Sequence, residues 1–310
     1  MRLLVTGASG FIGRNLLLAI PKKWETVAVY HRSNDFVSFL KKKDLRRVRL
    51  LRCDLSNVNA LKHQKLLTQG TFDACIYLAA NSDPTLSVSD PERDFRMTVL
   101  TVLNFLCHIK VKRLVYVSSG AVYEGNRGLV SPLTPFKSHL PYAISHWTAE
   151  RYIQSFWASR KNPKEYLIIR FFGAYGPYEP SRKIYTKLVR AFARRNCRIF
   201  SIRGNGKNLI DAMYVTDAAE ALLRALESPV KNLTFNLCSG RPLPIEALVR
   251  KAASVFGCGQ IKIRKKGPTA EPIHFRASTR FQKEKLHFTP KVSLKAGFQR
   301  FADFLKEESQ

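Results

Sequence analysis

Tyr142 and His146 are the pair of residues whose types and spacing most directly suggest chemistry. They stand four apart in "LPYAISHWTAE" (140–150), which has the pattern of a helix opening. Residues four apart share one face of a helix, so the phenol and the imidazole would lie side by side. A proton-transfer pair is one interpretation, because both groups can exchange protons. The other interpretation is a helix in which this spacing has no catalytic role. The residue types leave both interpretations open.

A glycine-rich turn near the start of the chain is the second chemical signal. "VTGASGFIGRNLL" places Gly7, Gly10 and Gly13 between a strand pattern and a helix pattern. These glycines would allow a tight turn, the close approach of a diphosphate, and close packing of the helix on the strand. The helix N-terminus favours negative charge. The turn predicts a dinucleotide site with contacts from Gly7, Ser9, Gly10, Phe11, Ile12 and Gly13.

The end of the second predicted strand indicates which form of the dinucleotide is bound. In "VAVYHRSND" (27–35), His31 and Arg32 stand where an acid would accept the ribose hydroxyls of NAD. Arg32 and Ser33 could instead hold the 2′-phosphate of NADP, while Asp35 could still reach the ribose. The sequence therefore favours NADP and leaves NAD open.

The elements that must position these residues alternate between short apolar runs and helical patterns. Runs that are apolar throughout and separated by helices are typical of a parallel sheet covered on both faces. The sequence therefore predicts an α/β fold of the Rossmann-like, doubly wound class. The predicted strands span 2–7, 26–31, 48–54, 74–80, 113–119 and 165–171, and helices are predicted at 11–20 and 95–109, among others.

After residue 172 the pattern changes to a Gly-, Pro- and Tyr-rich segment, followed by a basic helix over about 183–195. The segments 211–226 and 234–240 have the character of a return to the main sheet. We therefore predict a dinucleotide-binding domain of residues 1–172 plus about 210–240. A smaller, discontinuous C-terminal lobe of about 173–209 plus 241–310 would bind the substrate.

Composition excludes several classes of protein. Hydrophobic residues make up 45% of the 310 residues and aromatics 11%, which is too high for a largely disordered chain. No apolar run reaches the roughly 18–20 residues that span a bilayer. "MRLLVTG" enters a strand pattern at once and leaves no room for a signal peptide, so we expect a cytoplasmic protein. The six cysteines have no metal-ligand spacing, so no metal site is predicted.

The charge is strongly basic, with 52 Lys and Arg against 23 Asp and Glu, a formal +29. The densest stretch is "KKKDLRRVRLLR" (41–52). Such a surface attracts anions in general. No zinc finger, base-stacking motif or long basic tail accompanies it, so nucleic-acid binding is not the favoured interpretation.

Several motifs together resemble the extended short-chain dehydrogenase/reductase family, the sugar-nucleotide epimerases and dehydratases. "GASGFIG" (7–13) is similar to its cofactor turn, and "CDLSN" (53–57) and "IYLAA" (76–80) are similar to two further cofactor loops. "YVSSGAVYEG" (116–125) and "RFFGAYGPYEP" (170–180) resemble the catalytic strand end and a segment of the substrate lobe. The resemblance runs nearly end to end. It adds Asp54, Leu55, Leu78, Ala79 and Ala80 to the expected cofactor contacts.

In this family a tyrosine exchanges a proton with a substrate hydroxyl while hydride passes to or from nicotinamide. The resemblance implies this role for Tyr142, and implies that Ser119 orients the same oxygen. A lysine normally lowers the tyrosine pKa and holds the nicotinamide ribose, but His146 stands at that position. An imidazole is about one-quarter charged at pH 7, and a nearby tyrosinate could raise its pKa. His146 thus either supports the chemistry or only fills space.

Other positions depart from the family pattern as well. Thr98 stands where an asparagine usually supports the lysine, and Gly173 replaces an asparagine that approaches the substrate. Lys183, Arg203 and Arg276 are candidates for binding the substrate's diphosphate. The resemblance also implies a homodimer, through a helix near 95–109 and the helix that begins near Tyr142.

Three functions remain open at this stage. The favoured one is an NAD(P)-dependent epimerase, dehydratase or reductase that acts on a nucleotide-linked sugar. The second is a catalytically weak cofactor-binding scaffold or redox sensor, which the residues at 98 and 146 suggest. The third, suggested by charge alone, is a protein that binds nucleic acid or acidic lipid.

Overall fold

The computed structural model describes residues 1–158, 165–194, 197–267 and 274–308. Seven parallel strands within these ranges form one sheet in the order β12-β7-β5-β4-β1-β2-β3. The strand order reverses beside β1, as in a doubly wound sheet, so the predicted fold class is confirmed. The strands are β1 (Arg2–Thr6), β2 (Glu25–Tyr30), β3 (Val48–Arg52), β4 (Thr71–Tyr77), β5 (Lys110–Ser119), β7 (Glu165–Phe171) and β12 (Leu233–Leu237).

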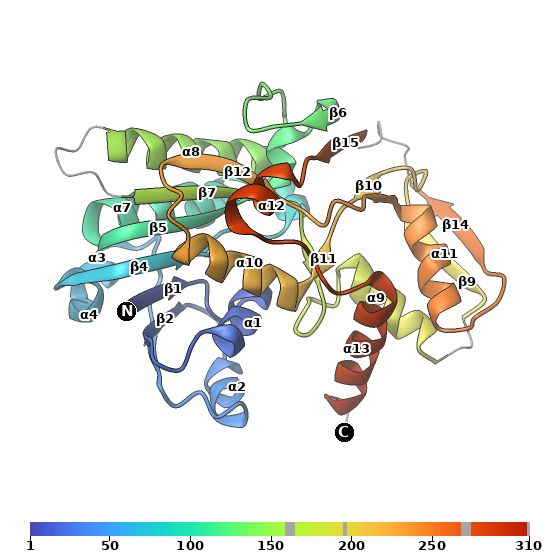
Figure 1. Ribbon diagram of the computed structural model, residues 1–310, viewed down its shortest axis with the longest axis horizontal. Coiled ribbons are helices and arrows are strands. Elements are labelled where there is room, and N and C mark those ends of the chain that lie inside the picture. Colours follow the sequence, from blue (N-terminus) through green and yellow to red (C-terminus); the bar gives the residue numbers. More distant parts are fainter. Residues whose placement is uncertain (159–164, 195–196, 268–273, 309–310) are drawn as a thin grey trace.

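Helices cover both faces of this sheet, as Figure 1 shows. Alternate strand residues point to opposite faces, so Leu3 and Val5 pack on one side and Leu4 on the other. One face is covered by α1 (Phe11–Ala19), α2 (Phe36–Lys42), α10 (Val215–Glu227) and α12 (Arg280–Leu286). The other face is covered by α3 (Val58–His63), α4 (Lys65–Thr68), α7 (Thr101–His108) and α8 (Pro141–Ala158).

The C-terminal lobe has a hydrophobic core of its own, which includes Tyr185, Phe192, Leu248 and Phe298. Its helices lie together at one end of the molecule in Figure 1. They are α9 (Ile184–Phe192), α11 (Ile245–Val255) and α13 (Leu294–Glu307). The division of the chain into two domains at the predicted boundaries stays a prediction.

The small sheets outside the main sheet are absent from the sequence-based prediction. Two are parallel pairs, β9 (Ile199–Arg203) with β14 (Lys262–Lys266), and β6 (Arg127–Val130) with β15 (His274–Ala277). Two are two-residue ladders, β8 (Ala174–Tyr175) with β11 (Met213–Tyr214), and β10 (Leu209–Ile210) with β13 (Leu243–Pro244). Four of the five residues of β14 are basic, so its composition gives little indication of a strand.

The predicted helix over 95–109 is interrupted. After α5 (Pro84–Ser89), α6 (Pro91–Phe95) leads into a π-helical turn, η1 (Arg96–Leu100), and only then into α7. Such turns are uncommon and are frequent at functional sites. This one carries Thr98, whose Oγ1 accepts a hydrogen bond from the Asn81 amide at 3.2 Å. The turn therefore ties the helix to the loop that follows β4.

No helix of the described residues has the length and apolar character that crossing a bilayer requires.

Candidate active site

The glycine turn after β1 has the geometry that the sequence predicts. Gly7 has φ +63°, and a Cβ there would lie 2.8 Å from the Ala79 backbone nitrogen. A Cβ on Gly13 would lie 2.5 Å from the Ala8 carbonyl oxygen. Both positions therefore exclude larger residues, because the turn passes under the end of β4 and α1 packs closely on the turn.

The start of α1 fits an anionic group. Gly10 is the N-cap residue, is exposed, and no acidic side chain stands in the first turn. The first amides of a helix have no partners within the helix, and the helix dipole adds positive potential there. Leu78 and Ala79 donate their amides to Thr6 Oγ1 at 3.1 and 3.3 Å, which fixes the neighbouring loop. The residues present thus fit a dinucleotide diphosphate.

Arg14, which the sequence analysis did not select, ties this turn to the end of β2. Its Nε donates to the Ser9 carbonyl at 2.9 Å. Its Nη2 donates to Ser33 Oγ at 3.0 Å and to Asp35 Oδ1 at 2.8 Å. Ser33 and then Arg14 lower the pKa of Asp35 below its usual value by hydrogen bonding to its carboxylate. The feature of the sequence that could have indicated this role is the basic residue directly after Gly13.

The guanidinium of Arg14 lies against three aromatic rings. The ring centroids of Phe36, Phe39 and Tyr178 lie 5.6, 4.9 and 5.6 Å from it. The Tyr178 ring also contacts Phe304 of α13, with ring centroids 4.8 Å apart. Arg14 therefore holds the predicted adenosine end of the cofactor site in a fixed position next to the C-terminal lobe.

The other residues predicted near the adenosine also lie together. His31 Nε2 lies 3.6 Å from Asp54 Oδ2, and Asp54 Oδ1 accepts from the Ser56 amide at 2.9 Å. The Leu55 carbonyl accepts from Asn104 Nδ2 at 2.9 Å, a contact from α7 that the sequence did not reveal. Arg32 is exposed and makes no ion pair with the described residues. Its charge therefore remains available to a ligand.

Ser119 and Tyr142 meet at the carboxyl end of β5. Burial raises the pKa of Tyr142, the neighbouring Ser119 side chain lowers it by less, and Asp94 and Asp83 raise it further. The net pKa is above the ordinary value of 10. At neutral pH Tyr142 is therefore a protonated phenol.

His146 lies beside Tyr142, with ring centroids 4.6 Å apart, and only 3% of its surface is exposed. Its Nδ1 lies 3.3 Å from the Tyr116 hydroxyl, and its Nε2 makes no hydrogen bond to the described residues. Burial lowers the pKa of His146 to about 4, although Asp94 and the Asn81 backbone act in the opposite direction. Because Tyr142 is protonated, no tyrosinate raises this pKa, and desolvation of the imidazolium outweighs the charge of Asp94.

A buried polar cluster adjoins this pair. Asp94 accepts hydrogen bonds from Asn81 Nδ2 and from Ser145 Oγ, both at 2.6 Å. The backbone amide of Asn81 donates a hydrogen bond to Thr98 Oγ1, in the π-helical turn. This cluster joins the loop after β4, the turn between α6 and α7, and α8. None of its hydrogen bonds was predictable from sequence spacing, since the partners lie up to 51 residues apart.

The depressed pKa of His146 predicts a pH-dependent loss of stability. The unfolded chain binds a proton at this residue below about pH 6.5, whereas the folded chain does so only below about pH 4. The contribution of His146 to the free energy of unfolding is therefore complete above pH 6.5. As the pH falls from 6.5 to 4, the free energy of unfolding decreases by roughly 1 kcal/mol per pH unit. Denaturant titrations at several pH values should show that the free energy of unfolding depends less on pH in His146→Gln than in the wild-type protein. His63→Gln, which alters an exposed histidine, is the control and should keep the wild-type slope.

A buried ion pair supports the strand ends behind Ser119. Arg170 of β7 donates from Nη2 to Glu150 Oε2 of α8 at 2.8 Å, and the two side chains are only 8% and 2% exposed. Glu150 also accepts from Ser118 Oγ at 2.5 Å, and Arg170 Nη1 donates to the Tyr123 hydroxyl at 3.0 Å. The pair links β5, α8 and β7 next to the predicted catalytic residues.

The four predicted substrate residues other than Ser119 lie on separate elements. Gly173 follows β7 with φ +125°, which favours glycine. Lys183 precedes α9, and its Nζ lies 3.3 Å from the Ser82 carbonyl oxygen, near the loop after β4. Arg203 is exposed at the end of β9 and Arg276 is exposed on β15. Whether they bind one substrate together stays a prediction.

The fold and the turn are those of the Rossmann class. The model of the NAD dependent epimerase/dehydratase family matches residues 3–238, and the chain therefore belongs to this family. The resemblance inferred from the sequence motifs is thus confirmed. Its relatives include proteins named as dehydratases, epimerases and a reductase of nucleotide-linked sugars.

Individual relatives are distant but extensive. The dTDP-D-glucose 4,6-dehydratase of Homo sapiens is 24% identical over 263 residues, which is 81% of this chain and 72% of the relative. The UDP-glucose 4-epimerase of Thermotoga maritima, solved with UDP-glucose, is 24% identical and has a TM-score of 0.87, with full coverage of both chains. MoeE5, solved with UDP-glucuronic acid and NAD, is 25% identical with a TM-score of 0.83, covering 99% of this chain and 100% of its own.

Proposed function

We propose that this chain is an NAD(P)-dependent epimerase, dehydratase or reductase that acts on a nucleotide-linked sugar. The observation that carries the proposal is the placement of the Ser119 and Tyr142 side chains next to each other, at the same sheet edge as the glycine turn. Membership of the epimerase/dehydratase family supports it, as do the nucleotide sugars bound by similar solved structures. A bound nicotinamide would supply hydride transfer to or from a sugar carbon.

Tyr142 would exchange a proton between its hydroxyl and the reacting oxygen of the sugar, and Ser119 would orient that oxygen. The raised pKa of Tyr142 means that this proton is present at neutral pH. No basic side chain of the described residues contributes to lowering that pKa. The resting site is therefore prepared to donate a proton, which is the requirement for reducing a sugar ketone.

Turnover tests this proposal directly. Purified protein would be incubated with NAD, or with NADH or NADPH, and a panel of UDP-, dTDP- and GDP-linked sugars and their keto derivatives. Epimerised, dehydrated or reduced sugars, detected by mass spectrometry and by cofactor absorbance, are the expected products. Absence of any product from the whole panel would contradict the enzymatic proposal.

The cofactor form is proposed to be NADP. Arg32 is an exposed cation at the end of β2, while Arg14 already partly neutralises Asp35. Arg32→Gln should therefore weaken NADP binding about tenfold, which corresponds to the loss of one charge-assisted hydrogen bond, and leave NAD binding nearly unchanged. Dissociation constants measured by calorimetry test this. An equal effect on both cofactors would show that Arg32 does not distinguish them.

A homodimer formed by α8 and the helix near 95–109 is supported by three apolar side chains, Phe95, Ile144 and Tyr152, which are 46, 42 and 44% exposed. Sedimentation velocity tests it, since a monomer at micromolar concentration would contradict it. A cytoplasmic location remains a prediction from the sequence.

A second candidate function, a cofactor-binding scaffold with little activity, is favoured by the neutral, buried His146. His146→Lys separates the two candidates, because it places a cation beside Tyr142. A large gain in turnover would indicate an enzyme that has lost its lysine. Lower turnover in a folded variant would indicate that histidine has a role of its own.

A further inference from the structure

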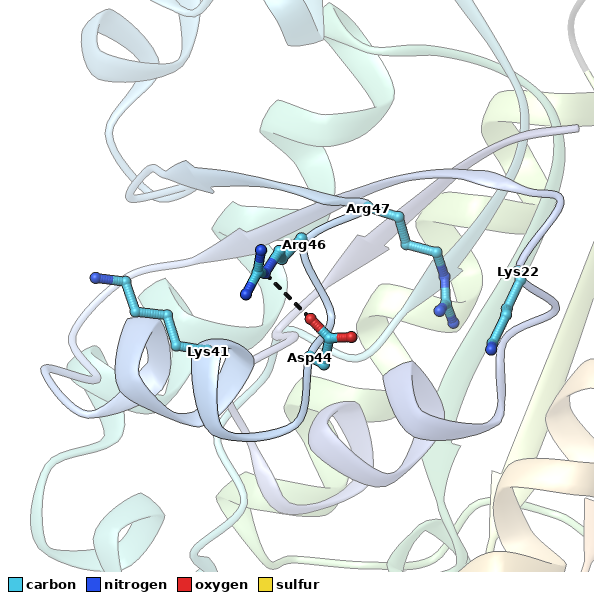
Figure 2. Close-up of a pocket in the computed structure, with 5 residues that line it drawn as sticks. All are labelled: Lys22, Lys41, Asp44, Arg46 and Arg47. Carbon is cyan, nitrogen blue, oxygen red and sulfur yellow. Dashed lines mark ion pairs between the residues drawn. The ribbon is translucent and has the colours of Figure 1, made fainter.

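A basic hollow lies at the surface between α1, α2 and the start of β3. It has a volume of about 580 Å³ and is lined by Lys22, Lys41, Asp44, Arg46 and Arg47. Figure 2 shows these five side chains. Four of the five come from the basic stretch 41–52, which the proposed enzymatic function does not use.

The hollow is separate from the candidate active site. Lys22 precedes β2, and Arg46 and Arg47 precede β3, so the hollow lies at the amino ends of these parallel strands. The glycine turn follows the carboxyl end of β1, at the opposite edge of the sheet. Helix α1 runs between the two, from Phe11 beside the turn to Ala19 near the hollow.

The cations of the hollow are not balanced by the protein. Its single lining carboxylate, Asp44, pairs with Arg46 at 3.1 Å, and both are largely exposed. Lys22 and Lys41 make no ion pair with the described residues. In Figure 2 the charged ends of Lys22 and Arg47 converge, whereas the Lys41 side chain extends away from them on the other side of Asp44. Like charges held this way repel one another, and a shared anion would remove that repulsion.

The backbone offsets only part of this charge. Helices α1 and α2 both end near the hollow, and each C-terminus contributes roughly half a negative charge. Arg47 Nη2 donates to the Ile20 carbonyl at 3.0 Å, at the end of α1. Its Nε is buried and has no hydrogen-bond partner among the described residues. Four cations against one carboxylate and two helix ends still leave a net positive hollow.

We propose that this hollow binds an anion that carries several clustered phosphate charges, either free in solution or in a lipid headgroup. A single charge would bind weakly, because ion pairs at exposed sites are screened by water and salt. A polyphosphate can contact several of the cations at once. No aromatic residue lines the hollow, so it lacks the stacking surface typical of single-stranded nucleic-acid sites.

Calorimetric titration with inorganic tripolyphosphate tests the proposal, with NAD present to occupy the glycine turn. The test variant is Lys22→Gln/Lys41→Gln/Arg46→Gln, which leaves Arg47 and its contact with α1 in place. The matched control, Lys262→Gln/Arg264→Gln/Lys266→Gln, removes the same charge from exposed positions of β14. Melting temperatures confirm that both variants fold.

The hollow variant should weaken tripolyphosphate binding about tenfold or more, and the β14 control less than about threefold. Equal weakening in both variants would overturn the proposal, since it would show only the effect of net charge. Absence of wild-type binding would also overturn it. Neither variant alters the glycine turn, so the comparison is valid even if NAD does not bind.

Two further arms identify the source of the phosphate. Co-sedimentation with phosphatidylcholine vesicles that contain phosphatidylinositol bisphosphate, reduced in the hollow variant alone, would assign a headgroup. Tripolyphosphate binding without vesicle binding would assign a free anion. The proposal would be overturned if the protein bound an RNA oligonucleotide through these three side chains but did not bind tripolyphosphate.

Discussion

Replacing Tyr142 with phenylalanine should lower the kcat of the sugar-nucleotide reaction by about 10²–10⁴-fold, the usual contribution of a positioned acid or base. The phenylalanine ring keeps its place beside His146 but lacks the hydroxyl next to Ser119. Affinity for the dinucleotide should change little, because the glycine turn and the contacts of Arg14 are untouched. Steady-state kinetics with the substrate found in the panel, together with cofactor titration, would measure both effects.

Tyr152→Phe is the matched control, since Tyr152 lies on the same helix, α8, and is 44% exposed. It should retain wild-type kcat. Near-wild-type turnover in Tyr142→Phe would remove Tyr142 from the mechanism, whatever the cofactor affinity. A parallel loss of folding, seen by circular dichroism, would require the comparison to be repeated with Ser119→Ala, which removes only the partner hydroxyl.

The largest expected effect on stability is at the buried ion pair of Glu150 and Arg170. Arg170→Met should lower the free energy of unfolding by about 3–5 kcal/mol, because it leaves a buried carboxylate without its cation. The long apolar side chain fills similar space, so loss of packing is a small part of the effect. Urea unfolding followed by fluorescence would measure the change.

Arg250→Gln provides the comparison for this prediction. It breaks the Arg250–Glu246 pair on α11, in which Arg250 is 58% exposed, and should cost no more than about 1 kcal/mol. The double variant Glu150→Gln/Arg170→Met removes both charges and should recover part of the loss. A cost below about 1 kcal/mol for Arg170→Met would show that the carboxylate is protonated or solvated in the folded protein.

The sequence predicted those parts of the fold that depend on local pattern. The glycine turn and the apolar strands of the main sheet were predicted because the turn needs glycine and buried parallel strands are apolar throughout. The pairing of β9 with β14 was not, because it joins segments about 60 residues apart and β14 is nearly all basic. β9 (IFSIR) does alternate buried and exposed residues, but β14 (KIRKK) has only one apolar residue, so the pair cannot be identified from both strands.

Site residues could be predicted from the sequence where the residue type alone indicates the role. They were missed where the role depends on contacts that form only in the folded chain. Ser119 and Tyr142 were selected by resemblance, and their side chains lie next to each other in the structure. The neutral state of His146 depends on burial, which spacing does not reveal. Arg14 was missed because its three hydrogen-bond partners lie on the turn and on the segment after β2, which meet only in the folded chain.

Calorimetric titration of the purified protein with NADP and with NAD tests the central claim most directly. We predict one dinucleotide bound per chain, with NADP bound more tightly than NAD. Binding should be lost in Gly13→Val, whose side chain would collide with the Ala8 carbonyl and displace the turn. Absence of binding by both cofactors to the folded wild-type protein would contradict the account.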